Sequence, residues 1–177
     1  MDIAEEKQAQ RTSGKAARRA LSPEQRADAV QNAQTILLYA AFGGEAGLAG
    51  FAAEAARRGK VLAYPVCGEN CSLTAAVPGP DGWETGLYGI RTPVLERSVL
   101  LEPEQLDLVL VPCTAFDADC FRVGMGKGYY DRYLPRCTKA AKIGIALEVQ
   151  RVAHAAVDEH DQRLDAFVTE RGLYTWT

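Results

Sequence analysis

The sequence predicts an α/β fold, a single-domain three-layer sandwich built on a mostly parallel open sheet. Short apolar runs typical of buried strands recur along the chain, and the clearest covers residues 108–111. Segments with helical composition separate several of these runs, as they do in βαβ units. A chain of 177 residues can bury one core of its own, so residues 1–177 are expected to form one domain.

Composition and charge exclude several classes of protein. Apolar residues make up 47% of the chain and charged residues 24%, which excludes a disordered chain. The net charge of -3 lacks the basic excess that nucleic-acid binding requires. No apolar run approaches the roughly 20 residues of a membrane span, and the charged N-terminus lacks the apolar core of a secretory signal. We therefore expect a cytoplasmic protein without nucleic-acid or membrane partners.

The five cysteines are odd in number and have no paired C-x-x-C spacing. Reduced thiols of a cytoplasmic protein are the expected state. A zinc site is a minor alternative, because the spacings miss the usual structural patterns. Its ligands would be Cys67, Cys71, Cys113 and Cys120.

Residues 3–21 are expected to form a helix, because they are rich in Ala, Gln, Lys and Arg. On that helix Lys7, Arg11, Lys15 and Arg18 fall within roughly 80° of one another and form a basic stripe. A solvated face is the ordinary interpretation of such a stripe. The apolar face is mostly alanine and gives the helix little reason to dock by itself, so closure over a polyphosphate is the functional alternative.

The next elements are expected in the order helix, strand, helix, strand, over residues 22–33, 35–40, 48–58 and 60–65. Ser22 and Pro23 are typical of a helix start. Gly59 suits the left-handed residue after a helix, and Pro65 is expected to stop the strand. The strand-helix-strand order predicts a crossover between parallel strands. Residues 67–97 are rich in Gly and Pro and are expected to form short antiparallel or edge strands.

A loop with two glycines and one acid, Gly43, Gly44 and Glu45, follows the first of these strands. Ligands in open α/β sheets gather at the carboxyl ends of strands, so this loop lies on the expected side of the sheet. By itself Glu45 is an ordinary loop acid.

The buried run 108–111 leads through Pro112, which should end the strand, toward alternate glycines at Gly124, Gly126 and Gly128. Their spacing is neither that of a Walker A loop nor that of the dinucleotide fingerprint. A glycine-rich turn between a buried strand and a helix can direct backbone N-H groups at phosphate oxygens. Three glycines alone are equally compatible with a flexible surface turn.

Charged side chains around this turn favour the phosphate interpretation. Arg122 and Lys127 supply cationic donors for phosphate, and Asp131 supplies an oxygen ligand for a metal that travels with the phosphate. A helix is expected over residues 129–137.

The last part of the chain is expected to hold a buried strand at 142–147 and a final strand, with partial alternation, at 164–170. The acidic run 158–161 lies between them, and such a run is usually a solvated turn. Its alternative use is Mg²⁺ ligation, for which one or two carboxylates plus substrate phosphates suffice. His154 is expected to be structural, and the role of His160 stays open.

The glycine turn and its flanks resemble the signature of the 5-formyltetrahydrofolate cyclo-ligases, also called 5,10-methenyltetrahydrofolate synthetases. The matching residues are Phe116, Asp117, Arg122, Val123, Gly124, Gly126, Lys127, Gly128, Tyr129, Tyr130 and Asp131. The resemblance implies a Rossmann-like sheet with an isomerase/CoA-transferase-like topology. It also implies a monomeric enzyme that uses ATP and Mg²⁺ to cyclise 5-formyltetrahydrofolate to 5,10-methenyltetrahydrofolate, with release of ADP and phosphate, through phosphorylation of the formyl oxygen.

The same resemblance implies roles for individual residues. The nucleotide side would comprise Lys7, Arg11, Arg122, Gly124, Gly126, Lys127, Gly128, Tyr129, Tyr130 and Asp131. The folate side would comprise Ala40 or Ala41, Glu45, Met125 and Tyr129. The metal ligands would be Asp131 and Asp161. The catalytic residues would be Arg122, Lys127 and Tyr130, although core packing is an equally good interpretation of Tyr129 and Tyr130.

Three positions depart from the family pattern. Family members commonly carry Glu-Pro after Gly-Ile, whereas residues 89–93 here read Gly-Ile-Arg-Thr-Pro. Cys113 replaces a common glycine, and Val123 replaces a leucine. The missing acid concerns the folate-side contacts and leaves the nucleotide side unchanged.

Two other classes of protein stay open. A sugar-phosphate isomerase or CoA-transferase-like enzyme could use a glycine-rich phosphate loop without ATP, with Glu45 as the obvious catalytic carboxylate. A noncatalytic nucleotide- or folate-binding protein would bind its ligands without releasing phosphate.

Overall fold

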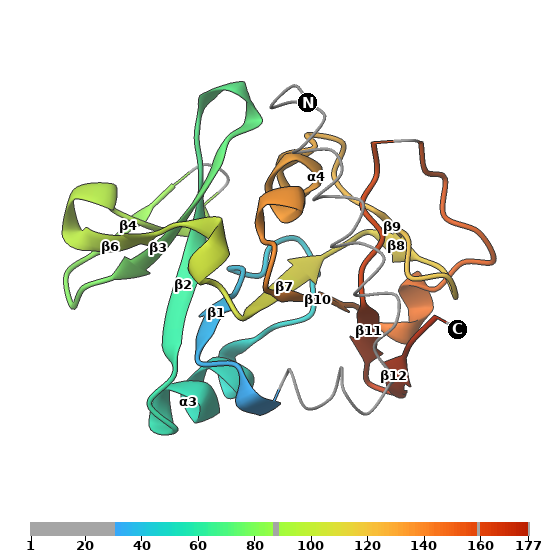
Figure 1. Cartoon of the computed structure of the whole chain (residues 1–177), viewed down its shortest axis with the longest axis horizontal. Coiled ribbons are helices and arrows are strands. Elements are labelled where there is room, and N and C mark those ends of the chain that lie inside the picture. The colour runs from blue at the N-terminus through green and yellow to red at the C-terminus, as the bar shows by residue number, and fades with distance from the viewer. Residues whose placement is uncertain (1–30, 87–88, 159, 177) are drawn as a thin grey trace, which may run out of the picture.

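The computed structural model describes residues 31–86, 89–158 and 160–176 (Figure 1). The predicted helix 3–21, with Lys7 and Arg11, lies outside the described residues, as does nearly all of the predicted helix 22–33. Within the described ranges no helix combines the length and the apolar composition needed to cross a bilayer.

One eight-stranded sheet organises the described chain. Its strands are β1 (Thr35–Leu37), β2 (Val61–Cys67), β3 (Leu73–Pro78), β6 (Ser98–Leu101), β7 (Leu108–Pro112), β10 (Ala141–Ile145), β11 (Ala166–Thr169) and β12 (Gly172–Tyr174). They lie in the order β12-β11-β10-β7-β1-β2-β3-β6. The central strands β11, β10, β7, β1 and β2 pair in parallel, and antiparallel strands complete both edges. The predicted α/β fold with a mostly parallel open sheet is confirmed.

Apolar side chains cover both faces of this sheet. On one face, α3 (Ala49–Arg57) contributes Ala55 to a cluster with Ile36 and Leu108. On the other face, α4 (Tyr129–Tyr133) contributes Tyr133 to a cluster with Leu37 and Val109. Successive residues of β1 and of β7 enter opposite clusters because side chains alternate across a strand. The sheet is therefore the middle of three layers.

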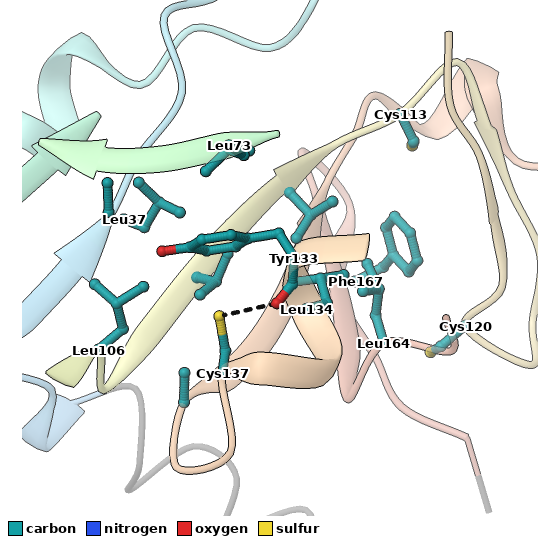
Figure 2. Packing of buried hydrophobic residues seen from close by; sticks show 14 of the residues in the cluster. Leu37, Leu73, Leu106, Cys113, Cys120, Tyr133, Leu134, Cys137, Leu164 and Phe167 are labelled. Atoms are coloured by element: carbon teal, nitrogen blue, oxygen red, sulfur yellow. Dashed lines mark hydrogen bonds between the residues drawn. The ribbon is translucent and has the colours of Figure 1, made fainter. Parts of the chain in front are cut away.

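The cluster on the α4 face anchors that short helix. Figure 2 shows the Tyr133 ring close to Leu37 and Leu73, with the Cys137 thiol 3.7 Å from the Tyr133 carbonyl oxygen. In the same cluster the rings of Phe116 and Phe167 stack with their centroids 4.4 Å apart. Burial at this end of α4 holds the helix on the sheet, so the residues at its other end have a fixed position.

Two small ribbons and several 3-10 turns connect the strands of the sheet. The ribbons pair β4 (Trp83–Thr85) with β5 (Arg91–Pro93) and β8 (Ala115–Phe116) with β9 (Arg122–Val123). The 3-10 turns are η1 (Glu69–Cys71), η3 (Leu95–Arg97), η4 (Pro103–Gln105), η5 (Leu134–Arg136) and η6 (Glu148–Gln150). The strands β3, β4 and β5 confirm the short antiparallel strands predicted within residues 67–97.

Three expectations about element ends are wrong. β2 continues through Pro65 to Cys67, because β1 pairs with it only as far as Ala63 and the missing N-H of Pro65 costs nothing on that side. α4 is shorter than predicted, because Pro135 has no N-H for an α-helical bond and the last turn becomes 3-10. β11 is not the last strand, since the chain turns back at Gly172 into β12.

The topology places the loops of interest at one edge. β1 lies between β7 and β2. The chain therefore continues from β1 to β2 on one side and later returns as β7 on the other side. The carboxyl ends of β1 and β7 flank this switch point, where open α/β sheets bind ligands. Glu45 follows β1, and the segment that leads to the glycine turn follows β7.

Candidate active site

The glycine turn joins the β8-β9 ribbon to α4. Gly126 and Gly128 adopt φ angles of 78° and 69°, a left-handed backbone that favours glycine. Gly128 directly precedes the first residue of α4. The side chains of Met125 and Lys127 are exposed. The turn therefore presents Lys127 to solvent from a backbone that other residues would strain.

Arg122 lies buried next to this turn, with 4% of its surface exposed. Its Nη2 donates a hydrogen bond of 2.8 Å to Asp131 Oδ1. A Cβ at Gly124 would come within 3.0 Å of Arg122 Nη1, so the glycine leaves room for the guanidinium. Arg122 Nε is buried and has no hydrogen-bond partner among the described residues. An unpaired buried donor is costly, and an anionic ligand would satisfy it.

Asp131 also receives a donor from the C-terminal segment. The backbone N-H of Gln162 donates to Asp131 Oδ1 at 3.3 Å, which brings the neighbouring Asp161 to the same part of the molecule. Asp161 Oδ2 accepts the N-H of Asp158 at 2.7 Å, and Asp158 Oδ1 accepts the N-H of His160 at 2.7 Å. The acidic run is therefore partly a self-bonded turn, as its ordinary interpretation predicts, and it still approaches Asp131.

Metal ligation here would need help from the substrate. The described residues contain no group of three or more His, Cys, Asp or Glu side chains that could hold a metal ion. All five cysteines are free and described, so the alternative zinc site is not formed. Two carboxylates supplemented by phosphate oxygens remain a suitable donor set for Mg²⁺, because this ion usually keeps several waters.

Glu45 belongs to a loop that is held at both ends. Its Oε2 accepts the backbone N-H of Phe42 at 3.0 Å. The hydroxyl of buried Tyr39 donates to the carbonyl oxygen of Ala46 at 2.6 Å. Burial raises the pKa of Glu45, and the bond from Phe42 opposes that rise. The carboxylate is therefore a partly desolvated acceptor at the carboxyl end of β1. Ala40, at the start of this loop, is half-buried.

The folate side and the phosphate side predicted from the sequence lie within electrostatic range of each other. Burial raises the pKa of the Tyr130 hydroxyl, the charges of Cys67 and Glu45 raise it further, and Arg122 lowers it. Burial also raises the pKa of the Cys113 thiol to about 12, with Arg122 lowering it and Glu45 raising it. Glu45, Arg122 and Tyr130 are distant in sequence and share one neighbourhood in the fold.

Tyr129 and Tyr130 both pack against the core, which is one of the two interpretations that the sequence left open. Both are half-buried and pack against the cluster on the α4 face. The guanidinium carbon of Arg122 lies 5.8 Å from the centroid of the Tyr130 ring, within the range of a cation-π contact. Tyr130 therefore packs against the core and also lies beside the buried guanidinium of Arg122.

The sequence pattern assigns no role to Asp117, which the structure buries with 5% of its surface exposed. Its carboxylate accepts backbone N-H groups from Asp119, Phe121 and Ala155. An aspartate that bonds the amide two residues later is a known turn pattern and could have been predicted. The bond to Ala155 has no local signal.

Comparisons with known proteins agree with the signature in the sequence. Residues 2–170 match the family described as the 5-formyltetrahydrofolate cyclo-ligase family. The 5-formyltetrahydrofolate cyclo-ligase of Escherichia coli K12 is 30% identical over 178 residues, which cover 90% of this chain and 97% of that protein. The Mycoplasma pneumoniae cyclo-ligase is 44% identical over 70 residues, 39% of this chain. That match spans 42% of the Mycoplasma protein. The 5-formyltetrahydrofolate cyclo-ligase of Mus musculus is 38% identical over 79 residues, which span 39% of the mouse protein.

Solved structures show the same likeness. The solution structure of Aquifex aeolicus 5,10-methenyltetrahydrofolate synthetase superposes with a TM-score of 0.69 at 30% identity, over 96% of this chain and 92% of that one. The Mycoplasma pneumoniae 5,10-methenyltetrahydrofolate synthetase superposes with a TM-score of 0.63 at 26% identity, over 92% of this chain and 97% of that one.

Proposed function

The chain belongs to the 5-formyltetrahydrofolate cyclo-ligase family, and from this premise we propose that it cyclises 5-formyltetrahydrofolate to 5,10-methenyltetrahydrofolate at the expense of ATP, with Mg²⁺ as the cofactor. ADP and phosphate are the other products. The free state of all five cysteines supports the cytoplasm as the compartment.

The observation that carries this proposal is the buried Arg122 beside the glycine turn. Its guanidinium has one bond to Asp131 and a buried Nε that lacks a partner among the described residues. The fold already desolvates Arg122, and Asp131 orients it, so its guanidinium can donate hydrogen bonds to a phosphate oxygen without further reorganisation. The absence of a side chain at Gly124 keeps the space around Nη1 open.

The chemical difficulty is a formamide oxygen that leaves poorly. The formyl oxygen at N5 attacks the γ-phosphorus, the bond to the bridging oxygen breaks, and ADP leaves. N10 then attacks the activated formyl carbon and loses its proton, and the carbon-oxygen bond breaks with release of inorganic phosphate. Each step needs positioning and charge neutralisation more than a protein nucleophile.

The chain's own groups divide this work. Lys127, exposed on the glycine turn, and Arg122 neutralise the phosphates, and the amides of Gly124, Gly126 and Gly128 cradle them. Asp131 and Asp161 would hold Mg²⁺, which supplies charge neutralisation at the phosphates when it is bound. Tyr130 stands between the two substrates in this proposal, and burial raises the pKa of its hydroxyl above the ordinary value. Lys7 and Arg11 are further phosphate contacts in this proposal.

Glu45 binds the folate in the same proposal. Its partly desolvated carboxylate can accept hydrogen bonds from the N-H groups of a pterin ring, and a desolvated acceptor strengthens such bonds. Ala40, Met125 and Tyr129 supply apolar contacts to the folate. The electrostatic proximity of Glu45 to Tyr130 supports a folate that reaches the phosphate side.

The decisive experiment measures absorbance in the methenyl-folate band after mixing the protein with 5-formyltetrahydrofolate, ATP and MgCl₂. We expect a rise that requires both ATP and Mg²⁺ and falls at least about a hundredfold in rate in Lys127→Ala. Lys139→Ala is the matched control, because Lys139 is an exposed lysine after α4 and outside the turn.

Other outcomes separate the remaining classes. Turnover of a phosphorylated substrate without ATP would identify an isomerase-like or transferase-like enzyme. Binding of ATP and folate without phosphate release would identify a noncatalytic binding protein. An equal loss in both lysine variants would contradict the phosphate role of the glycine turn.

A further inference from the structure

We propose that Asp117 is a positioning residue that holds the two halves of the phosphate and metal site together. The proposal rests on the function proposed above. It assigns to Asp117 no contact with either substrate.

Asp117 bonds two segments that are far apart in the sequence. Its Oδ1 accepts the backbone N-H groups of Asp119 and Phe121, each at 3.0 Å, and these residues form the tip of the β8-β9 ribbon. Its Oδ2 accepts the N-H of Ala155 at 2.9 Å, which lies 38 residues later. Bonds from backbone amides to a buried carboxylate are charge-assisted and stronger than neutral ones.

A neighbouring contact shows that the attachment of the later segment is specific. The N-H of Val152 donates to the carbonyl oxygen of Phe116 at 2.8 Å, and Phe116 also forms an isolated bridge with Arg151. Phe116 and Asp117 together therefore attach residues 151–155 to the ribbon by backbone and side-chain hydrogen bonds.

The same two segments meet again at Asp131. Arg122, next to Phe121, donates to Asp131 Oδ1 from the ribbon side. Gln162, seven residues after Ala155, donates its backbone N-H to the same oxygen. The ribbon and the C-terminal segment thus form a closed ring, bridged by Asp117 at one point and by Asp131 at the other. Release at Asp117 removes the link at Ala155, and the segment of Asp161 is then held by the 3.3 Å bond to Asp131 and, on its far side, by the bonds of Arg163 to Asp119 and of the Leu164 N-H to the Cys120 carbonyl oxygen.

A carboxylate is required at position 117 because all of its partners are donors. An ionised carboxylate accepts at both oxygens, whereas an asparagine side chain carries one acceptor and one donor. In Asp117→Asn the amide oxygen can keep the two ribbon bonds, and the NH₂ group then faces the N-H of Ala155. The substitution therefore weakens the attachment of the C-terminal segment at Ala155 while it leaves the two ribbon bonds intact. With both oxygens occupied and little surface exposed, Asp117 has no free group for a ligand.

The test compares Asp117→Asn with Asp107→Asn in the full-length protein. Asp107 also accepts two backbone N-H groups, from Gln34 and Thr35, but at the amino edge of the sheet. Hydrogen exchange of the amides of residues 152–162 reports the attachment directly. Steady-state kinetics with each substrate varied in turn reports its consequence.

We expect at least about tenfold faster exchange in residues 152–162 of Asp117→Asn and a KM for MgATP raised about tenfold, with the KM for 5-formyltetrahydrofolate changed less than about twofold. Asp107→Asn should change none of these quantities. A lower melting temperature of Asp117→Asn with unchanged exchange and unchanged KM for MgATP would overturn the proposal and leave Asp117 an ordinary stabilising residue.

A second variant keeps the test decisive if Asp117→Asn does not fold. Ala155→Pro deletes the donor and keeps the carboxylate, and it should reproduce both effects. Normal exchange and a normal KM in that variant would overturn the proposal. If the wild type shows no ATP-dependent cyclisation, the proposed function fails, and hydrogen exchange still decides whether Asp117 holds the C-terminal segment.

Discussion

Carboxylates lie at both edges of the parallel sheet, and they bond to different parts of the chain. At the amino edge, Asp107 Oδ2 accepts the N-H groups of Gln34 and Thr35, each at 2.9 Å, and so joins the start of β7 to the start of β1. Asp165 Oδ2 accepts the N-H of Lys142 at 2.8 Å and joins the start of β11 to that of β10. These acids connect neighbouring strands.

At the carboxyl edge the carboxylates bond to groups of the loops. Asp131 pairs with the buried Arg122 and with the backbone of Gln162, and Glu45 accepts an amide of its own loop. The residue type is the same at both edges, and the partner differs. Acids that join strand starts stabilise the sheet, whereas the acids in the loops beside the buried cation would, in the function proposed above, position the groups that meet a ligand. Single substitutions should therefore separate stability from catalysis according to the edge.

The largest effect on catalysis is expected from Asp131→Asn. The substitution removes a metal ligand of the proposed site and leaves the buried Arg122 without its negative partner. We expect kcat/KM for cyclisation to fall about a thousandfold. The measurement is steady-state kinetics over a range of Mg²⁺ concentrations.

Asp165→Asn is the matched control, because Asp165 is also a carboxylate that accepts a backbone N-H, that of Lys142 at 2.8 Å, but it lies at the amino edge. It should keep kcat/KM within about twofold of the wild type. Equal losses in the two variants would show that the edges do not differ in function.

The next effect in size is expected from Glu45→Gln. The substitution removes the charge and keeps the shape, so acceptance of pterin N-H groups weakens. We expect the KM for 5-formyltetrahydrofolate to rise at least about tenfold while the KM for MgATP stays constant. A rise in the KM for MgATP instead would place Glu45 on the nucleotide side, and the division of the carboxyl edge into two sides would be wrong.

Much of this edge was predictable from local sequence. The buried strand 108–111 and the glycine turn follow from an apolar run and from alternate glycines, and β7 and the φ angles of Gly126 and Gly128 confirm them. The helix after the turn was predicted, although Pro135 shortens it. The likeness to a family assigned roles to Arg122 and Asp131, and their bond to each other was not part of that expectation.

The remaining features depend on contacts between distant segments. Pro65 suggested a strand end because the pattern cannot show that β1 stops pairing at Ala63. The link from Asp117 to Ala155 spans 38 residues and has no periodicity that would reveal it. The environment of Tyr130 on α4 likewise depends on Glu45, which follows β1. Such contacts are decided by strand order, which local propensity does not encode.

The stability of the protein should depend on pH through Glu45. Burial raises the pKa of Glu45, so the folded protein binds its proton more readily than the unfolded chain does. Its contribution to stability is therefore full below the ordinary carboxyl range and is lost as the pH rises through the raised pKa. The wild type loses this contribution between acidic and neutral pH, whereas Glu45→Gln does not. We therefore expect the melting temperature of Glu45→Gln minus that of the wild type to increase over this pH range. A constant difference over this range would contradict the desolvation of Glu45.

The smallest effect, and one confined to stability, is expected from Asp107→Asn. The asparagine oxygen can still accept the N-H groups of Gln34 and Thr35, so only the charge assistance of two exposed bonds is lost. We expect the free energy of unfolding to fall by about 1 kcal/mol and the melting temperature by about 2–4 °C. Thermal unfolding followed by circular dichroism measures both quantities. Because β1 and β7 pair in register beyond these bonds, their carboxyl ends should keep their positions, and both KM values should match those of the wild type. A change in either KM would mean that a displacement at the amino edge is transmitted to the loops through β1 and β7. The division of the acids into stabilising and functional sets by edge would then be wrong.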